Sequence, residues 1–495
     1  MAEMVTNSAV IIGGGVGGLA CACYLAKEGI KVTLVEKNEQ IGGRASVLER
    51  DGFRFDMGPS WYLMPDVFER FFKFFDREPK DYYELIQLDP HYRIFFKDGE
   101  KIDIFSDIEK NKNTFEKIEA GSGESLVKYL DKSKITYEIG MQKFVYKDRP
   151  KLIDYFSWDV LRNAHKVKLF GSMQNHVAKY FSNSKLQQIM QYTLVFLGGS
   201  PKNTPALYNL MGHVDFNLGV YYPKGGMGNV ISAMVELGEE LGVEYKLNFE
   251  VDSIEGERGS FVLKSVFGEE IKSDVVVSNA DYRHTEMELL PKKMMQYDSK
   301  YWKSRVYAPS AFLIYLGVKG GIEPLIHHNL VIPVDWDDHF EKIFTDPAWP
   351  DDPAYCICAP SDTDNSVAPS GCSNMFILVP IAAGLEDSEE VRKEYRNKIL
   401  EDILENTGVE IEDRIIVEEH FSVKDFLNKY NSSKGSALGI AHTLNQTGPL
   451  RPNHRSKKLD GMYYTGGYTR PGIGVPMCLI SGEHTAKVVI EDGLK

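Results

Sequence analysis

The pattern of apolar and polar residues at the start of the chain predicts a strand, a helix and a second strand. Residues 10–12 form an apolar run that is typical of a buried strand. Residues 19–27 are rich in alanine and carry apolar residues at helical spacing, and Gly29 follows this helix. Residues 31–35 alternate between polar and apolar side chains, and the strand ends at Glu36. The sequence therefore predicts a β-α-β unit.

Glycines separate the first strand from the helix, because Gly13, Gly15 and Gly18 have G-x-G-x-x-G spacing. Such glycines permit a tight turn, a close approach of the backbone to a pyrophosphate, and close packing of the helix on the strand. The free N–H groups and the helix dipole attract the negative phosphates. Glu36, at the end of the second strand, can accept hydrogen bonds from ribose hydroxyl groups. The unit is therefore predicted to bind a dinucleotide.

A second glycine pair favours one of the two common dinucleotides. Gly42, Gly43 and Arg44 follow the second strand after a short loop. Their backbone and the guanidinium group can approach the same pyrophosphate or the flavin side of a cofactor. Folds that bind NAD do not need this element, so FAD is the predicted cofactor.

The pattern beyond residue 45 predicts further strands and helices. In chain order they are a strand at 53–55 and a turn at 56–61, a phenylalanine-rich helix at 65–76, a hairpin at 91–105, a mainly helical stretch from 112 to 218, a helix at 229–241, strands near 245 and 275, strands at 311–318 and 375–380, a helix at 388–406, and a C-terminal strand, glycine-rich loop and helix at 462–465, 466–477 and 478–489. The strands near 245 and 275 are expected to extend the first sheet. The C-terminal strand, loop and helix are expected to bring both ends of the chain together at one cofactor.

A chain of 495 residues is too long for one simple core. We predict an α/β fold in which a Rossmann-type FAD-binding domain is interleaved with an α+β substrate domain and a helical, membrane-facing region. The FAD-binding domain is assigned to residues 1–110, 222–300 and 431–495. The helical region, where substrate would enter from a membrane, is assigned to 111–221, and the substrate domain to 301–430.

The composition excludes several other classes of protein. A net charge of −14 argues against a nucleic-acid partner. Six cysteines in a chain of this size do not indicate a disulfide framework. Cys21 and Cys23 fall within the first helix, and Cys356 and Cys358 share one strand face with no histidine or acidic cluster nearby in the sequence, so no metal is predicted. No signal peptide and no run of 18 apolar residues is found, so a cytoplasmic protein is expected.

Residues 151–188 depart from the acidic character of the chain, with six lysines or arginines against two aspartates. Aromatic residues, including Phe156, Trp158 and Phe170, are interspersed with the basic ones. This pattern is typical of a helix that lies in a membrane interface. A solvated basic face over an ordinary core is the alternative.

The motifs taken together resemble those of the phytoene desaturase family of FAD-dependent carotenoid desaturases, and the resemblance covers nearly the full length. It depends on five stretches: 13–18 with Glu36, 42–44, 55–60, 223–226 and 471–476. The resemblance implies a fold like that of flavin amine oxidases, non-covalent FAD, and a carotenoid taken from the membrane. One departure is Gly467, because many amine oxidases have an acidic residue there.

The resemblance also implies which residues bind the cofactor and the substrate. The backbone of Val251 would contact the adenine, and the backbone of 475–477 would face the flavin ring. Asp159 and Arg162 match an acid and an arginine that are thought to act on the substrate. The complete predicted cofactor site consists of Gly13, Gly15, Val16, Gly17, Gly18, Glu36, Lys37, Gly43, Arg44, Gly58, Pro59, Ser60, Val251, Gly466, Gly467, Val475, Pro476 and Met477.

The predicted reaction is desaturation of a C40 polyene, with hydride transfer to the flavin and loss of a proton to a group such as Asp159. A membrane quinone or oxygen would reoxidise the flavin, and the protein would associate peripherally with an anionic membrane surface. The alternatives within this class are a hydroxycarotenoid 3,4-desaturase and a dehydrosqualene desaturase. A soluble flavin amine oxidase and a non-catalytic lipid-binding flavoprotein are the alternatives from other classes.

Overall fold

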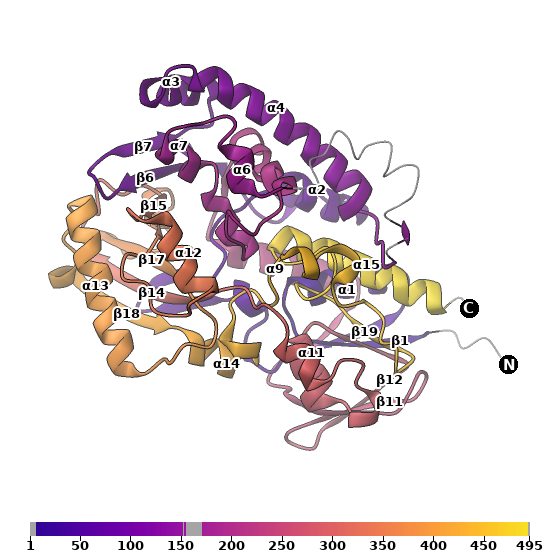
Figure 1. The fold of residues 1–495 in the computed structure, drawn as a ribbon. Coiled ribbons are helices and arrows are strands. Elements are labelled where there is room, and N and C mark those ends of the chain that lie inside the picture. Colours follow the sequence, from indigo (N-terminus) through magenta and orange to yellow (C-terminus); the bar gives the residue numbers. More distant parts are fainter. Residues whose placement is uncertain (1–5, 152, 155–170, 494–495) are drawn as a thin grey trace.

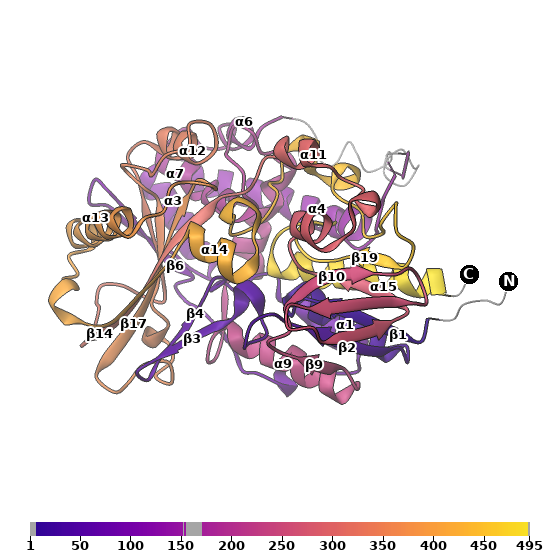
Figure 2. The ribbon, with the colours of Figure 1, turned by 90° about the horizontal axis from the view of Figure 1, so that it is seen from below.

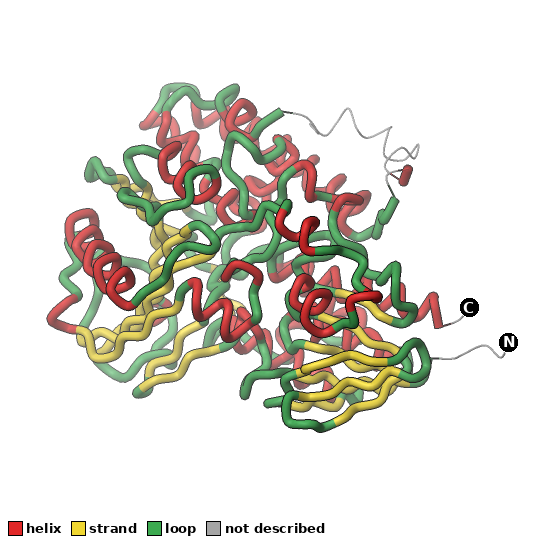
Figure 3. The backbone as a smooth tube through the Cα atoms, turned by 60° about the horizontal axis from the view of Figure 1, so that its bottom comes forward, coloured by secondary structure: helices red, strands yellow, loops and turns green. Residues whose placement is uncertain are grey.

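Two sheets organise the fold in a computed structural model of the protein, which describes residues 6–151, 153–154 and 171–493. A parallel sheet and a larger, mostly antiparallel sheet lie on opposite sides of the molecule, with helices above them (Figures 1 and 3). The first sheet has five strands in the order β19 (Met462–Tyr464), β13 (Val275–Ser278), β1 (Ser8–Ile12), β2 (Lys31–Val35) and β9 (Glu244–Lys246). The predicted extension of this sheet by strands near 245 and 275 is confirmed.

The parallel sheet is covered on both faces. Successive side chains of a strand point to opposite faces, so alternate residues of β1 belong to two different cores. Ala9 and Ile11 of β1 pack in a core with the helices α1 (Val16–Lys27), α9 (Met227–Glu240) and α15 (Val475–Gly493). Val10 and Ile12 point to the other face. There they share a core with residues of the antiparallel strands β10 (Val251–Glu255) and β11 (Phe261–Ser265), which form a small sheet with β12 (Glu270–Ser273). Figure 2 shows this small sheet beside β1 and β2.

The second sheet has seven strands in the order β18 (Ile415–Phe421), β14 (Ser310–Lys319), β17 (Cys372–Ile381), β16 (Tyr355–Cys358), β15 (His328–Ile332), β6 (Tyr92–Phe96) and β7 (Lys101–Ile104). The hairpin expected at 91–105 is present as β6 and β7, but it pairs with β15 in this sheet. It therefore lies outside the parallel sheet, although the predicted boundary of the cofactor domain is at residue 110. Hydrophobic alternation predicts the strands of a hairpin and carries no information on which sheet they join.

Short ribbons and helices complete the fold. The ribbons are β3 (Val47–Arg50) with β4 (Phe53–Asp56) and β5 (Leu85–Gln87) with β8 (Tyr221–Pro223). The other helices are α2 (Pro65–Phe74), α3 (Ile108–Ile118), α4 (Ser122–Gly140), α6 (Met173–Val177), α7 (Ser184–Ile189), α8 (Leu210–Gly212), α10 (Tyr282–His284), α11 (Ser299–Lys303), α12 (Trp336–Phe344), α13 (Glu389–Thr407) and α14 (Val423–Tyr430). Within the described parts of the chain, we find no helix with the length and apolar character needed to cross a bilayer.

The C-terminal helix begins earlier than its pattern predicts. The expected start was Cys478, whereas α15 begins at Val475. Pro476 is the second residue of the helix. N–H groups in the first turn have no partner within a helix, so the missing N–H of proline costs no hydrogen bond there. The glycine-rich loop therefore leads directly into a helix N-terminus.

An ion pair joins α15 to α2. Both terminal nitrogens of the Arg70 guanidinium donate to Glu483, one of them at 2.7 Å, and Lys487 donates to the same carboxylate at 2.6 Å. Burial alone would raise the pKa of Glu483, but these hydrogen bonds and charges lower it to about 2. The pair therefore stabilises the position of the helix that begins at the glycine-rich loop.

Arg70→Ala is expected to lower the free energy of unfolding by about 2 kcal/mol at pH 7. This is less than the cost of breaking a fully buried pair, because the Arg70 side chain is 38% exposed and its charge is screened by solvent. Since the pKa of Glu483 is depressed from its ordinary 4.5 to about 2, the contribution is complete above pH 4.5 and disappears as the pH falls towards 2. Urea unfolding of both proteins between pH 7 and pH 3 measures this difference.

Arg77→Ala is the matched control, because Arg77 pairs with Glu240 at a site where both side chains are more exposed, 44% and 37%. It should leave stability nearly unchanged. A difference between wild type and Arg70→Ala that stays constant across this pH range would contradict the role of Glu483.

Candidate active site

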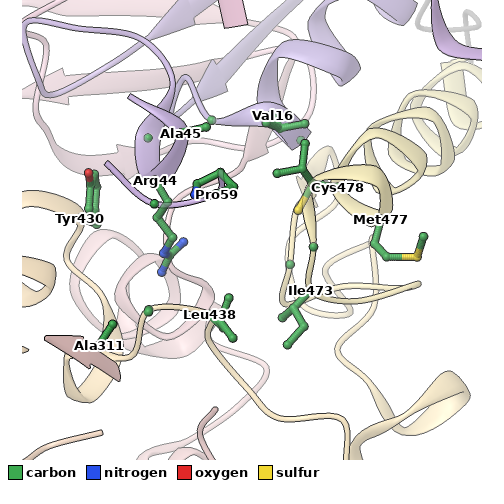
Figure 4. Close-up of a pocket in the computed structure, with 18 of the residues that line it drawn as sticks. Val16, Arg44, Ala45, Pro59, Ala311, Tyr430, Leu438, Ile473, Met477 and Cys478 are labelled. Carbon is green, nitrogen blue, oxygen red and sulfur yellow. The ribbon is translucent and has the colours of Figure 1, made fainter. Parts of the chain in front are cut away.

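A cavity of about 570 Å³ extends from the glycine loop of the parallel sheet to the inner side of the seven-stranded sheet. One end is lined by the residues that follow β1, β2 and β13, which are the carboxyl ends of parallel strands. Ligands of open parallel sheets bind at this edge. The close-up in Figure 4 shows Arg44, Pro59 and Tyr430 on one side of the cavity and Ile473, Met477 and Cys478 on the other.

The structure brings nearly all of the predicted cofactor residues together. Those that line the cavity are Gly13, Gly15, Val16, Gly17, Glu36, Lys37, Gly43, Arg44, Gly58, Pro59, Ser60, Val251, Gly467, Val475, Pro476 and Met477. Gly18 and Gly466 are not in the lining, but they lie against Gly13 and Gly17, which are. The predicted substrate residues Asp159 and Arg162 lie outside the described residues.

Two glycines are required by the close approach of the backbone. A Cβ atom on Gly18 would lie 2.2 Å from the carbonyl oxygen of Gly13. A Cβ atom on Gly17 would lie 2.8 Å from the Cα of Gly466 and 2.9 Å from its nitrogen. The glycine loops from the two ends of the chain are therefore in contact, which confirms the prediction that the ends meet.

Glu36 is buried at the end of β2 and holds the loops around it. One carboxylate oxygen accepts from the Gly14 N–H at 2.8 Å, and the other accepts from the backbone and side chain of Asn38 at 3.0 and 2.7 Å. A carboxylate has about four acceptor positions, so capacity remains for the hydroxyl groups of a ribose. The position of Glu36 fits its predicted role.

Arg44 offers an unsatisfied positive group to the cavity. Its terminal nitrogen donates to Ser432 Oγ at 3.1 Å, while its Nε is buried and makes no hydrogen bond. The guanidinium lies over the Tyr430 ring, 5.9 Å from the centroid. A buried donor without an acceptor is costly, so this site fits a pyrophosphate or another anionic group of a cofactor.

Sequence reasoning missed the residues that hold the C-terminal loop. Arg451 is fully buried and donates to backbone carbonyls, among them Gly467 at 2.7 Å and Ile440 at 2.9 Å. Burial lowers its pKa to about 10, so it stays charged at neutral pH. An isolated arginine in a loop carries no sequence signal for such a role.

A histidine and a tyrosine beside the same loop were also missed. The N–H of Ile473 donates to His442 Nε2 at 3.1 Å. Burial holds the pKa of His442 well below its usual value, so the ring is neutral. Because Nε2 accepts from Ile473, the proton of the ring is on Nδ1. That N–H donates to the Tyr208 hydroxyl at 2.8 Å. Both side chains line the cavity, so the pair fixes a polar group beside the loop before α15.

The position of Asn279 in the sequence could have identified it as a site residue. It follows β13, donates to the Gly13 carbonyl at 3.1 Å and lines the cavity. A polar residue at the carboxyl end of a parallel strand is a candidate ligand contact.

The sequence as a whole matches known proteins over nearly its full length. A sequence profile of the flavin containing amine oxidoreductases matches residues 16–490. The chain belongs to the flavin containing amine oxidoreductase family. A carotenoid 3,4-desaturase from Haloarcula japonica is 60% identical over 493 residues, 99% of this chain and 100% of that protein. A zeta-carotene-forming phytoene desaturase from Myxococcus xanthus is 32% identical over 476 residues, 95% of this chain and 92% of that protein.

These relatives confirm the resemblance to the carotenoid desaturases, and membership of the family identifies the chain as an FAD-dependent oxidoreductase. Solved structures share the fold. Putrescine oxidase bound to putrescine has a TM-score of 0.64 at 14% identity, with 98% of this chain and 99% of that chain covered. An oxidoreductase from Methanosarcina mazei has a TM-score of 0.63 at 16% identity, with 97% and 100% covered.

Glu36→Ala is expected to weaken FAD binding at least tenfold. Hydrogen bonds to a charged group contribute about 1.5–3 kcal/mol each, and the variant also removes the acceptor of the Gly14 N–H. Equilibrium dialysis of the apoprotein with FAD measures the change. Glu39→Ala is the control, because it removes the same charge from an exposed position in the same turn. Equal FAD affinity of the two variants would show that Glu36 only ends a strand.

Proposed function

We propose that this protein is an FAD-dependent carotenoid desaturase that introduces a 3,4 double bond. The observation that carries the proposal is the cavity, which joins the dinucleotide edge of the parallel sheet to an apolar chamber. The relative at 60% identity, a carotenoid 3,4-desaturase, supports this choice of bond. Phytoene desaturation is the second candidate, favoured by the relative at 32% identity.

The far end of the cavity suits a hydrocarbon. Its described lining there is mostly aliphatic or aromatic and includes Trp61, Leu63, Leu330, Ile332, Trp336 and Leu378. The acidic residues of the lining, Glu36, Glu250 and Asp281, come from segments beside the parallel sheet. An amine substrate would need polar partners in the chamber for its ammonium group, so this lining favours a polyene over an amine.

The chain has three tasks in removing two hydrogens from a CH₂–CH₂ unit. It must align the polyene, exclude water and accept a proton. When bound, FAD supplies the two-electron acceptor. The glycine loops, Glu36 and Arg44 would hold the dinucleotide, and the first turn of α15 presents free N–H groups that stabilise negative charge beside them. Asp159 is proposed to accept the proton, and Arg162 is proposed to act on the substrate with it.

A C40 hydrocarbon is essentially insoluble in water, so we propose that the protein takes it from a membrane surface. The basic, aromatic segment 151–188 is proposed as the contact, although most of its aromatic residues lie outside the described part of the chain. The region 111–221 would then be the route of substrate entry, and a quinone or oxygen the final electron acceptor.

Binding to anionic liposomes is expected to fall with rising salt, because basic residues near such a surface contribute about 1 kcal/mol each. Changing Lys166 and Lys168 to Glu should weaken sedimentation with the liposomes at least tenfold. The same variant should slow turnover of liposomal substrate more than that of detergent-dispersed substrate. If the double variant binds liposomes as tightly as wild type, the segment 151–188 is not the membrane contact.

The bond choice is tested by product analysis with two substrates in liposomes. We expect the ratio of kcat to KM to be at least tenfold higher for a hydroxylated carotenoid with a saturated 3,4 bond than for phytoene. A preference for phytoene would contradict 3,4-desaturation and favour phytoene desaturation. Turnover of putrescine with no turnover of either carotenoid would overturn both.

A further inference from the structure

Three buried ligand-type side chains converge on the inner side of the seven-stranded sheet. They are His327 and His328, at the start of β15, and Cys358, which pairs with His328 in the neighbouring strand β16. One nitrogen from each ring and the sulfur lie within 4.8 Å of one another. All three side chains are at most 3% exposed. The two halves of the cluster are 30 residues apart in the sequence, which is why the pattern of cysteines alone predicts no metal.

The cluster has few hydrogen-bond partners for its buried polar atoms. His327 Nδ1 lies 2.8 Å from Thr363 Oγ1, whereas His327 Nε2 makes no hydrogen bond. Among the described residues, the His328 ring has only a polar contact with the backbone of Ser60, which does not meet the geometry of a good hydrogen bond. A neutral imidazole keeps one lone pair that a metal can use. A fully buried nitrogen without a good hydrogen bond is costly, so this cluster favours a bound ligand.

A second cluster of similar composition provides a contrast. Asp148, His454 and His484 also lie close together. There, however, Arg470 donates to the Asp148 carboxylate, at 2.5 Å from Nε, and His454 Nδ1 is bonded to Thr485 at 2.9 Å. The charge of Asp148 is therefore already paired with a cation, and the cluster has no need of a metal ion. The cluster around Cys358 has no such cation among the described residues.

We propose that His327, His328 and Cys358 bind one zinc ion. Two imidazole nitrogens and one thiolate are a donor set that zinc prefers. In a tetrahedral site such atoms lie about 3.3–3.8 Å apart, so small side-chain rotations suffice. The Cys358 thiol loses its proton to solvent as the sulfur–zinc bond forms, and water takes the fourth position. The bond from His327 Nδ1 to Thr363 orients that ring as a metal-bound histidine is oriented.

The charge and the neighbours of the site fit a structural ion. Two neutral rings and one thiolate leave a single positive charge on the site. Asp364 lies beside His327 and accepts from the N–H of Gly225 at 2.7 Å. Trp61, which lines the cavity, stacks on His328 with ring centroids 4.2 Å apart. The ion would therefore fix the His328 ring on which Trp61 stacks, and so steady one wall of the substrate chamber.

Metal analysis of the untagged holoprotein, expressed with zinc in the medium, tests the proposal. The amount of bound flavin measures the amount of folded protein. We expect about one zinc per flavin in wild type, and less than one-tenth of a zinc per flavin in His327→Gln and Cys358→Ser. Cys372→Ser, at a half-buried cysteine on β17 outside the cluster, should keep its zinc. Wild type without stoichiometric zinc, or both cluster variants with zinc retained, would overturn the proposal.

X-ray absorption at the zinc edge of wild type gives a second readout that needs no variant. We expect one sulfur at about 2.3 Å and two imidazole nitrogens at about 2.0 Å. A spectrum without sulfur would overturn the assignment even if the cluster variants do not fold. Removal of the metal by a chelator should lower the Tm of wild type by on the order of 5 °C, and added zinc should restore it.

Discussion

The Gly17→Ala protein is expected to purify without flavin, with FAD affinity reduced at least about 100-fold. The new Cβ atom would lie 2.8 Å from Asn279 Oδ1 and from the Cα of Gly466. Neither neighbour can give way cheaply, because one belongs to the backbone of the C-terminal loop and the other bonds to Gly13. The glycine loops from the two ends of the chain must then separate at the pyrophosphate position, which is where the cofactor needs them together.

Gly140→Ala is the matched control for this variant. Gly140 is helical, and its added Cβ atom would meet only Leu210 Cδ2 at an ordinary 3.8 Å. This change should leave flavin content unchanged and stabilise the protein slightly, by up to about 1 kcal/mol. The flavin absorbance per protein after gel filtration measures both variants. Full flavin content in Gly17→Ala would contradict the proposed cofactor position.

Cys356→Phe is expected to retain FAD and to lose at least about 90% of its turnover on a carotenoid. Cys356 is half-buried on β16 and lines the far end of the cavity. A phenyl ring there would occupy the space proposed for the polyene, because the chamber is enclosed by strands that cannot move apart. FAD binding should survive, since the cofactor residues come from the other end of the cavity.

Cys372→Phe separates this effect from general damage to the sheet. Cys372 is also half-buried and lies on the neighbouring strand β17, but it does not line the cavity. Its variant should keep both flavin and turnover. Equal loss of turnover in the two variants would show that the substrate does not reach β16.

The sequence predicted the cofactor half of the protein well because each of its signals is local. The first strand, the glycine loop and the helix are consecutive, and their periodicity changes from two to 3.6 within thirty residues. The motifs at 42–44 and 58–60 each lie in one short loop, the motif at 475–477 forms the first turn of α15, and all of them line the cavity.

The rest of the site could not be predicted, because it depends on contacts between distant segments. Tyr430 and His442 come from stretches without a motif and reach the cavity only because the seven-stranded sheet packs beside the first. The hairpin at 91–105 is a clear local pattern, but its partner β15 lies more than 200 residues later. His328 and Cys358 likewise meet only through strand pairing.

The most direct test of the account is an anaerobic half-reaction. Purified holoprotein is mixed, without oxygen, with liposomes that contain a carotenoid with a saturated 3,4 bond, and flavin absorbance and carotenoid products are followed together. The account predicts that the flavin bleaches while one carotenoid lighter by two hydrogens forms per flavin. A flavin that stays oxidised with carotenoids but bleaches with a primary amine such as putrescine would contradict it.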